Sequence, residues 1–393
     1  MIAVKEALAI IEQHKGSFGS EVIPFEQSVG RILDEDVMAD RDFPPFNRAA
    51  MDGIAISMSD WEKGMRSFPV SGEQFAGAPQ QELTHGTCLE IMTGAVVPKE
   101  ADVVIRYEDI TIENGKASVN IEEVSQGQNI HPQGVDSEAG TILIPVGKQL
   151  TIGDVGILTS VGKVEVKVRR LPKAALISTG DELVEPHETP LPHQIRKSNI
   201  HTLATLLKKA GIDFTIFHIN DSKEEITREI GEILKSYDLI LMSGGVSKGK
   251  RDYIPEVLEE LGVKKHFHRV MQRPGKPLWF GSNESTTVFG FPGNPVSTLA
   301  CFMVYCRYWL QSSLEMKVQN QHAKLGREIR FEKELTFFAS VSVKNELGEL
   351  IATPIKGNGS GDLVSLSLAD GFIELPAEKS IFKEGEVYPI YLF

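Results

Sequence analysis

The middle of the chain, from about residue 171 to residue 310, alternates short apolar runs with segments in which apolar residues recur every three or four positions. The runs 173–178, 214–219 and 238–242 are typical of strands buried on both faces. Amphipathic helices are predicted after Ser198 and Ser222 and over 253–261, and a long apolar helix after residue 295. Shorter strands are predicted over 267–271 and 286–289. This alternation predicts a parallel sheet covered by helices on both faces.

The flanking segments have a different pattern. Residues 65–150 carry frequent Gly and Pro between short β-type runs, which predicts a β-rich lobe. A helix is predicted over 153–161, followed by an alternating strand over 164–168. After residue 326 the pattern becomes short alternating strands, at 337–343, 350–354, 371–375 and 387–392. That tail predicts a small barrel or sandwich.

Composition narrows the class of protein. A chain of 393 residues, 41% hydrophobic and 24% charged, is ordinary globular protein in about two to four domains. No apolar run approaches the length that spans a bilayer, and the N-terminal segment reads as an amphipathic helix, not as a signal peptide. The three cysteines, Cys88, Cys301 and Cys306, lack metal or disulfide spacing, which suits a reducing cytoplasm. The net charge of −13 argues against a nucleic-acid partner.

Three glycine-containing loops follow predicted strands, at 178–182, 243–247 and 291–295. In an open α/β sheet, ligands bind beyond the carboxyl ends of the strands. Glycine lets backbone N–H groups approach an anion closely. One such loop alone would indicate only a tight turn, but three on successive strands predict a site for an anionic ligand.

A rigid pair of cations strengthens that prediction. In Arg273-Pro274-Gly275-Lys276-Pro277, two prolines and a glycine restrict the backbone that carries the two charges. Fixed cations suit an oxyanion. Other basic residues, such as Lys248, Lys250 and Arg251, are typical of a solvated surface. No Gly-x-Gly-x-x-Gly motif follows a strand and no Gly-Lys-Ser/Thr loop occurs, which argues against a dinucleotide-dependent dehydrogenase.

Acidic residues are the candidates for acid–base or metal chemistry, and some have a structural alternative. Asp221 lies beside Ser222, which with Glu225 can form a capping box, and Asp252 can cap the next helix. Taken alone, the residues favour capping over catalysis for both. His266 and His268 alternate along a predicted strand without metal spacing, which indicates surface or barrel positions.

At this point a family resemblance emerges. Residues 43–55, Phe-Pro-Pro-Phe-Asn-Arg-Ala-Ala-Met-Asp-Gly-Ile-Ala, resemble the Pro-x-Phe-x-x-Ser-x-Met-Asp-Gly-Tyr-Ala signature of the MoeA family, which includes the gephyrin E domain. Further segments resemble the family's later motifs in the same order, namely 92–102, 177–183, 243–253, 274–277 and 292–297. The matches span residues 1–361, and together they are highly specific.

The resemblance implies a molybdopterin molybdenumtransferase, which inserts molybdate into the dithiolene of adenylylated molybdopterin and releases AMP. It also implies an elongated homodimer in which each active cleft is completed by the second subunit. The implied fold is multidomain α/β and β. Its domains are a molybdopterin-binding α/β domain (1–18 plus 172–313), a small α+β connecting domain (19–38 plus 141–171), a β-rich lobe (39–140) and a C-terminal β-barrel (320–393).

The resemblance also implies site residues, by position in the motifs. The catalytic positions are Asp52, Thr93, Asp136, Glu182, Asp221 and Asp252. The positions that bind pterin, phosphate or molybdate are Ser243, Gly244, Gly245, Ser247, Pro292, Gly293, Asn294, Pro295, Arg273, Lys276, Pro277, Ser297 and Ser360. Carboxylates can hold Mg²⁺ against a phosphate, and Glu182, Asp221 and Asp252 are the metal-binding candidates.

Several positions depart from the family pattern. Ala49 stands in place of serine, Ile54 of tyrosine, Gln133 and Ala339 of arginine, Lys197 of an acidic residue, and Arg269 and Arg273 of lysine. Loss of an arginine at 339 would weaken oxyanion binding, and Lys344 or Lys356 is a candidate to compensate.

Three hypotheses follow: a competent enzyme, a non-catalytic pterin-binding scaffold on the same fold, and a generic nucleotide-binding transferase. The acidic positions together favour the enzyme, because a scaffold does not need them. The third hypothesis predicts a nucleotide loop, and the sequence has none.

Overall fold

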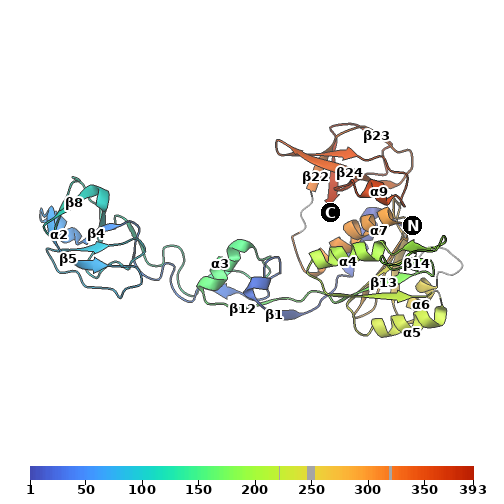
Figure 1. Cartoon of the computed structure of the whole chain (residues 1–393), viewed down its shortest axis with the longest axis horizontal. Coiled ribbons are helices and arrows are strands. Elements are labelled where there is room, and N and C mark those ends of the chain that lie inside the picture. Colours follow the sequence, from blue (N-terminus) through green and yellow to red (C-terminus); the bar gives the residue numbers. More distant parts are fainter. Residues whose placement is uncertain (221, 246–252, 318–320) are drawn as a thin grey trace. The chain divides into compact units, whose positions relative to one another are not determined.

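The computed structural model describes residues 1–220, 222–245, 253–317 and 321–393. The chain divides into two compact units, one formed by Met1–Glu21 with Arg169–Phe393 and the other by Val22–Val168 (Figure 1). Among the helices that can be described, none is both long and apolar enough to cross a membrane.

A six-stranded sheet forms the centre of the first unit, in the order β16-β13-β17-β21-β20-β18. The first four strands are parallel, as predicted. The prediction is wrong for the other two, because β20 runs antiparallel to β21 and β18 antiparallel to β20. Only residues 270–276 and 283–286 connect these strands, too few for a parallel crossover. The bounds are β13 (Ala174–Thr179), β16 (Phe214–Ile219), β17 (Leu239–Ser243), β18 (Lys264–Arg269), β20 (Pro277–Ser282) and β21 (Thr287–Phe291).

Helices cover both faces of this sheet, as the alternation predicted. On one face Leu176 and Phe289 pack with α1, α4 and the helices after residue 295, and on the other Ile177 and Val288 pack with α5 and α6 (Figure 1). A π-helical turn interrupts the predicted long helix, so it forms three consecutive elements. The bounds are α1 (Val4–Gln13), α4 (Asn199–Lys209), α5 (Lys223–Ile233), α6 (Ile254–Glu260), α7 (Pro295–Cys301), η3 (Phe302–Cys306) and α8 (Arg307–Ser313).

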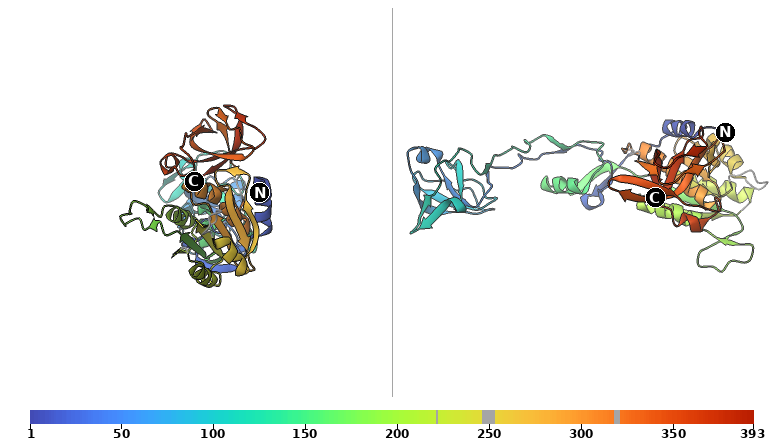
Figure 2. Two further views of the ribbon diagram at one scale, coloured as in Figure 1. Left: turned by 90° about the vertical axis from the view of Figure 1, so that its right-hand side faces the viewer. Right: turned by 90° about the horizontal axis from the view of Figure 1, so that it is seen from above.

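The tail closes into a five-stranded barrel in the order β24-β25-β22-β28-β26, with β26 returning to β24. A sixth strand, β19 (Gln272–Arg273), leaves the α/β part of the unit and pairs in parallel with β24. Figure 2 shows the barrel, in red and orange, beside the α/β part of the same unit. The barrel strands are β22 (Gln321–Leu325), β24 (Thr336–Glu346), β25 (Glu349–Pro354), β26 (Gly371–Leu375) and β28 (Val387–Leu392). The same part of the chain contains the small elements β23 (Ile329–Arg330), α9 (Leu363–Leu366) and β27 (Ile381–Phe382), and the α/β part contains the small strands β14 (Leu183–Val184) and β15 (Ile195–Arg196).

The second unit is β-rich, as predicted, and its main sheet has the order β7-β4-β6-β5-β9-β8. Its core includes Ile54, Trp61 and Phe68. The strands of this sheet are β4 (Gly53–Ile56), β5 (Ser67–Gln74), β6 (Cys88–Ile91), β7 (Val103–Arg106), β8 (Ile110–Glu113) and β9 (Lys116–Val119). The other elements of this part of the chain are β1 (Ser20–Pro24), η1 (Phe25–Gln27), β2 (Val37–Met38), β3 (Arg48–Ala49), α2 (Met58–Glu62), η2 (Tyr107–Asp109), β10 (Ile130–His131), β11 (Ile142–Ile144), α3 (Ile152–Ser160) and β12 (Glu165–Arg169).

Candidate functional site

Three of the predicted ligand loops leave the same edge of the central sheet. β13, β17 and β21 are parallel neighbours, with Ser178 opposite Ser243 and Ser243 opposite Phe291. Their carboxyl ends therefore lie side by side, which is where ligands bind in open α/β sheets.

The second loop packs closely against the first. Gly245 has a φ of +67°, and a Cβ there would lie 2.9 Å from Thr179 Oγ1 and 2.4 Å from Ile254 Cδ1. Only glycine fits this left-handed, crowded position. The adjacent N–H of Gly244 donates to the carbonyl of Phe291, 3.4 Å away. The three loops thus form one surface at the edge of the sheet.

Asn199 joins two of these loops, a role that sequence reasoning missed. Its side-chain amide donates to Ser243 Oγ at 3.0 Å and to the carbonyl of Gly293 at 2.7 Å. The predicted helix after Ser198 is present as α4, and Ser198 itself has helical backbone angles and makes no side-chain cap bond. A polar side chain at the first turn of a helix beside a ligand edge was the available signal.

The third loop connects the sheet edge to the barrel domain. Asn294 Nδ2 donates to Ser360 Oγ at 2.8 Å, and the N–H of Val296 donates to the carbonyl of Ser360 at 3.0 Å. Pro292 O accepts from Thr298 Oγ1 at 2.6 Å, which holds the start of the loop. The structure therefore brings Ser360, predicted from a distant motif, to the loop that contains Pro292, Gly293, Asn294 and Pro295.

The predicted cationic turn lies against the helix that follows this loop. A Cβ at Gly275 would lie 3.5 Å from the carbonyl of Ser297 in α7. Arg273 and Lys276 are exposed, and within the described parts of the chain neither side chain has a hydrogen-bond or ion-pair partner. Pro277 begins β20, and Ser297 is buried, with 4% of its surface exposed. Two unneutralised positive charges are therefore available beside the loop surface.

Only one of the three predicted metal ligands can be described. Glu182 is exposed, and its carboxylate folds over Gly180 at the end of β13. Asp221 and Asp252, as well as Ser247, lie outside the described residues. Half of the predicted capping box at Ser222 is present, since its Oγ accepts from the N–H of Glu225 at 3.5 Å. The return bond is replaced, because the N–H of Ser222 donates to the carbonyl of Asn220 at 2.8 Å. No group of three or more His, Cys, Asp or Glu residues arranged to hold a metal occurs in the ranges that can be described.

Asp52 and Thr93 come together in the second unit. β4 and β6 are antiparallel, with Gly53 opposite Ile91, so the residue before β4 faces the residues after β6. Asp52 Oδ1 accepts from Thr93 N at 2.6 Å and from Thr93 Oγ1 at 2.7 Å. These two bonds lower the pKa of Asp52, so its exposed carboxylate is charged at neutral pH.

Asp136 pairs with a histidine that sequence reasoning did not single out. His131 Nε2 lies 3.3 Å from Asp136 Oδ1, and both side chains are partly exposed. Nearby, Gln133 Nε2 donates to Asp42 Oδ2 at 2.7 Å. The N–H of Ala139 and then Gln133 lower the pKa of Asp42. The amide of Gln133 thus donates a hydrogen bond to the carboxylate of Asp42, as an arginine at this position could.

Four other departures from the family pattern occupy buried positions, whereas Arg269 is half-buried and Arg273 is exposed. Ala49 and Ile54 lie in the core of the β-rich lobe. Lys197 is 7% exposed and bonds Glu185 Oε1 at 2.6 Å, which lowers the pKa of Glu185. Ala339 is 5% exposed and packs inside the barrel, where β24 faces Ile373. An arginine at residue 339 would therefore have to leave an apolar interior before it could meet an anion.

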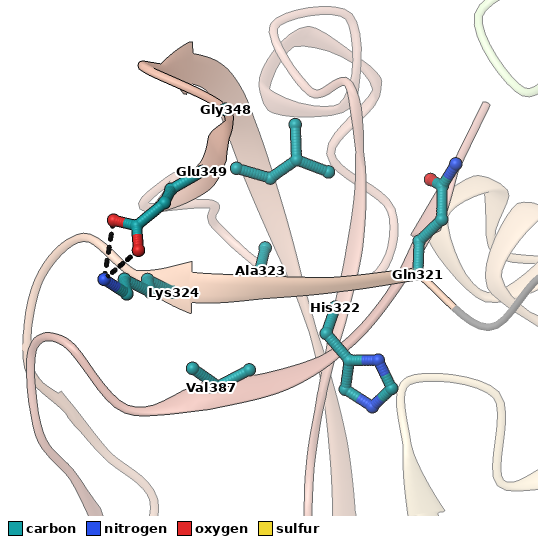
Figure 3. A pocket seen from close by; sticks show the side chains of 8 residues that line it. Gln321, His322, Ala323, Lys324, Gly348, Glu349 and Val387 are labelled. Atoms are coloured by element: carbon teal, nitrogen blue, oxygen red, sulfur yellow. Dashed lines mark hydrogen bonds and ion pairs between the residues drawn. The ribbon is translucent and has the colours of Figure 1, made fainter.

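A separate hollow of about 330 Å³ lies on the barrel (Figure 3). Lys324 Nζ pairs with Glu349 at 2.6 Å on one side of it, and His322 and Val387 line the opposite side. It contains none of the predicted site residues, and its own cation is neutralised. The candidate site is therefore the sheet edge, not this hollow.

Comparisons with known proteins agree with the motifs. The family regions described as "MoeA N-terminal region (domain I and II)", "Probable molybdopterin binding domain" and "MoeA C-terminal region (domain IV)" match residues 2–162, 175–312 and 322–393. A Synechocystis protein named molybdopterin molybdenumtransferase is 39% identical, and the match covers 100% of both chains. The chain belongs to the MoeA family. A Bacillus subtilis protein of the same name is 30% identical, over 100% of this chain and 94% of its own.

Solved structures extend the MoeA assignment to the fold. The crystal structure of a molybdopterin biosynthesis MoeA protein from Pyrococcus horikoshii has a TM-score of 0.85 at 32% identity, covering 100% of this chain and 99% of that one. A second structure of a MoeA protein from the same organism has a TM-score of 0.84 at 28% identity, covering 100% of both chains. The multidomain α/β and β architecture of this chain is thus that of MoeA proteins.

Proposed function

We propose that this chain is a molybdopterin molybdenumtransferase that acts in molybdenum cofactor biosynthesis. One structural observation supports the proposal in addition to membership of the family. Three strand-end loops form a surface in which Asn199 joins the second loop to the third and Asn294 joins the third loop to Ser360 of the barrel. Beside this surface lie two exposed cations that lack partners among the described residues. That surface suits a phosphorylated pterin together with an oxyanion.

The proposed substrates are adenylylated molybdopterin and molybdate, and AMP is the proposed leaving product. The backbone of residues 243–245 and 292–294 would hold the pterin and its phosphate. Arg273 and Lys276 would bind molybdate, a tetrahedral dianion, while Ser297 and Ser360 border that position. The exposed carboxylate of Glu182, with Asp221 and Asp252, fits Mg²⁺, which takes one or two carboxylates and completes its shell with water and phosphate oxygens. Bound there, Mg²⁺ would offset negative charge on the phosphate.

The acidic residues of the second unit would complete each cleft in a homodimer. Asp52, oriented by Thr93, is a fixed and charged carboxylate. Asp136 Oδ1 lies 3.3 Å from His131 Nε2. In the proposed arrangement these groups come from the other subunit and orient the substrate or accept a proton from it. The division of the chain into four domains and its cytoplasmic location stay predictions.

A reconstituted reaction tests the function directly. Purified protein is mixed with adenylylated molybdopterin, Mg²⁺ and molybdate, and AMP release is followed together with molybdenum bound to the pterin. We expect AMP to appear in step with molybdenum insertion and to require all components. Tight binding of the pterin without AMP release would select the non-catalytic scaffold instead, and absence of binding would reject both.

A further inference from the structure

A single buried amide holds the backbone of the cationic loop. Gln272 is 1% exposed, and its Nε2 donates to the carbonyls of Pro274 at 3.0 Å and Gly275 at 3.1 Å. Its Oε1 accepts from the hydroxyl of Tyr305, a fully buried residue of η3. A side chain of the helical layer is thereby connected to the loop that carries Arg273 and Lys276.

The orientation of this amide is fixed by its partners. The two carbonyls can only accept, so the nitrogen of Gln272 must face them and its oxygen must face Tyr305. Burial raises the pKa of Tyr305, so its hydroxyl stays protonated and remains a donor. Both polar atoms of the amide have hydrogen-bond partners in a buried position, and fully satisfied networks of this kind are rigid.

The backbone on both sides of Lys276 is held in the same way. The carbonyl of Gly275, just before Lys276, accepts from Gln272 Nε2 and from Cys301 Sγ at 3.6 Å. The carbonyl of Lys276 accepts from the N–H of Val270 at 3.0 Å. At Gly275 the φ is +84°, and a Cβ would lie 2.5 Å from Cys301 Sγ and 2.8 Å from Gln272 Nε2. The direction in which Lys276 leaves the loop is therefore determined by buried contacts.

Arg273 is held by a second device. As part of β19 it pairs with Phe337 of the barrel strand β24. The backbone that carries Arg273 is thus held by strand pairing, and the backbone next to Lys276 by the amide of Gln272. Holding the backbone at both positions narrows the range of separations between the two charges, which favours a small tetrahedral oxyanion.

We propose that Gln272 is a positioning residue for oxyanion binding. It touches no substrate; it sets the backbone from which Lys276 extends and thereby its spacing from Arg273. This inference rests on the proposed function, because molybdate is taken as the anion that the two cations receive. A positioning role makes the affinity for molybdate, and not that for the pterin, sensitive to residue 272.

The test measures the two substrates separately. Gln272→Leu keeps the volume but leaves the carbonyls of Pro274 and Gly275 without a donor, so the loop can relax. We expect the molybdate concentration that gives half-maximal molybdenum insertion to rise roughly 10-fold or more, as for other groups that orient a binding residue. The half-saturating concentration of adenylylated molybdopterin and the rate at saturating molybdate should stay within about twofold. Tyr305→Phe should act in the same direction but less strongly.

Thr286→Val is the matched control. Thr286 Oγ1 is buried and serves two carbonyls, those of Leu234 at 3.1 Å and Tyr237 at 2.9 Å, beside the amino-terminal ends of β17 and β21. Thr286→Val should lower the melting temperature about as much as Gln272→Leu does, without changing the half-saturating concentration of molybdate. The inference would be overturned if Gln272→Leu raised the half-saturating concentrations of molybdate and of adenylylated molybdopterin equally. It would also be overturned if neither Gln272→Leu nor Tyr305→Phe changed the half-saturating concentration of molybdate. If Gln272→Leu does not fold, Tyr305→Phe alone decides. A wild-type chain that inserts no molybdenum would instead refute the proposed function.

Discussion

The two compact units hold their candidate site residues in contrasting ways. In the first unit, side-chain amides join positions far apart in the sequence, such as Asn199 to Gly293 and Asn294 to Ser360, separated by 94 and 66 residues. In the second unit, Asp52 and Asp136 are exposed and contact groups in adjacent turns or strands. The first set is a surface in which several loops are joined to one another, whereas the second consists of exposed charged groups, Asp52 bonded to Thr93 41 residues away and Asp136 to His131 5 residues away. Substitutions should therefore act through geometry in the first unit and through chemistry in the second.

The largest expected effect comes from combining one defect from each unit. Asp52→Asn and Lys276→Ala should each abolish molybdenum insertion alone. If each cleft takes Asp52 from one subunit and Lys276 from the other, a mixed dimer contains one intact site. Unfolding and refolding the two variants together should then restore about one quarter of the wild-type rate, because about half of the dimers are mixed and each has one working site of two.

Each variant refolded alone provides the control for this experiment and should remain inactive. Analytical ultracentrifugation of the mixture establishes whether dimers are present. Dimers without recovered activity would place both residues of a cleft on one subunit, and a monomer would contradict the shared cleft altogether.

Asn199→Ala should have an intermediate effect, confined to the first unit. It removes both bonds that connect Ser243 and Gly293, and a side-chain hydrogen bond of this kind is worth about 1 kcal/mol. We expect the half-saturating concentration of adenylylated molybdopterin to rise roughly 10-fold, since the loops lose their mutual orientation. Asn120→Ala, which removes an exposed bond to Thr111 in the second unit, should leave it unchanged. Equal effects of the two substitutions would contradict the proposed link between the loops.

The smallest expected effect is a dependence of stability on pH in the first unit. The rings of His266 and His14 are tilted by 37° with centroids 3.6 Å apart, and Nε2 of His266 lies 2.9 Å from Ser282 Oγ. Burial, and then the neighbouring His14, lowers the pKa of His266 from 6.5 to about 4. Between these pH values the unfolded chain binds a proton that the folded chain does not, so stability is lost as the pH falls from 6.5 towards 4.

Calorimetry at pH 7 and pH 5 can measure this effect. Because the histidine pair is only partly buried, solvent screening limits the expected shift to a few degrees. His266→Gln, which can keep a polar contact to Ser282 but cannot titrate, should shift less between the two pH values. An identical shift in the variant would assign the acid sensitivity to other groups. The structure also corrects the placement of His266, which lies in the α/β sheet against α1 and not in the barrel.

The parts of the fold that sequence reasoning predicted are those with an unambiguous apolar pattern. β13 and β17 are continuous apolar runs, and both are buried at every position. β20 was missed because Pro277 at its start read as part of a turn, although Leu278, Trp279 and Phe280 are fully buried. No local pattern states that a strand will run antiparallel, since that follows from the length of its connections.

The candidate site divides in a similar way. Ser243, Gly293 and Ser360 were predicted because they lie in recognisable motifs, and the structure brings their loops together. Asn199 was missed because a single polar side chain does not indicate partners that lie 44 and 94 residues away. Gln272 was missed because nothing in its local sequence indicates burial against Tyr305, which lies 33 residues away. The burial of Lys197 was missed because its contact with Glu185 forms only once β14 and β15 pair.

The pairing of β19 with β24 has a practical consequence for dissecting this protein. The chain enters the barrel sheet at Gln272 and rejoins the central sheet at Pro277, so only the three residues 274–276 separate the two sheets there. A fragment that stops before the barrel would expose an unmatched backbone edge at Arg273, beside the ligand surface. The affinity of such a fragment for an anion would differ from that of the native protein, so binding is best measured on the entire polypeptide.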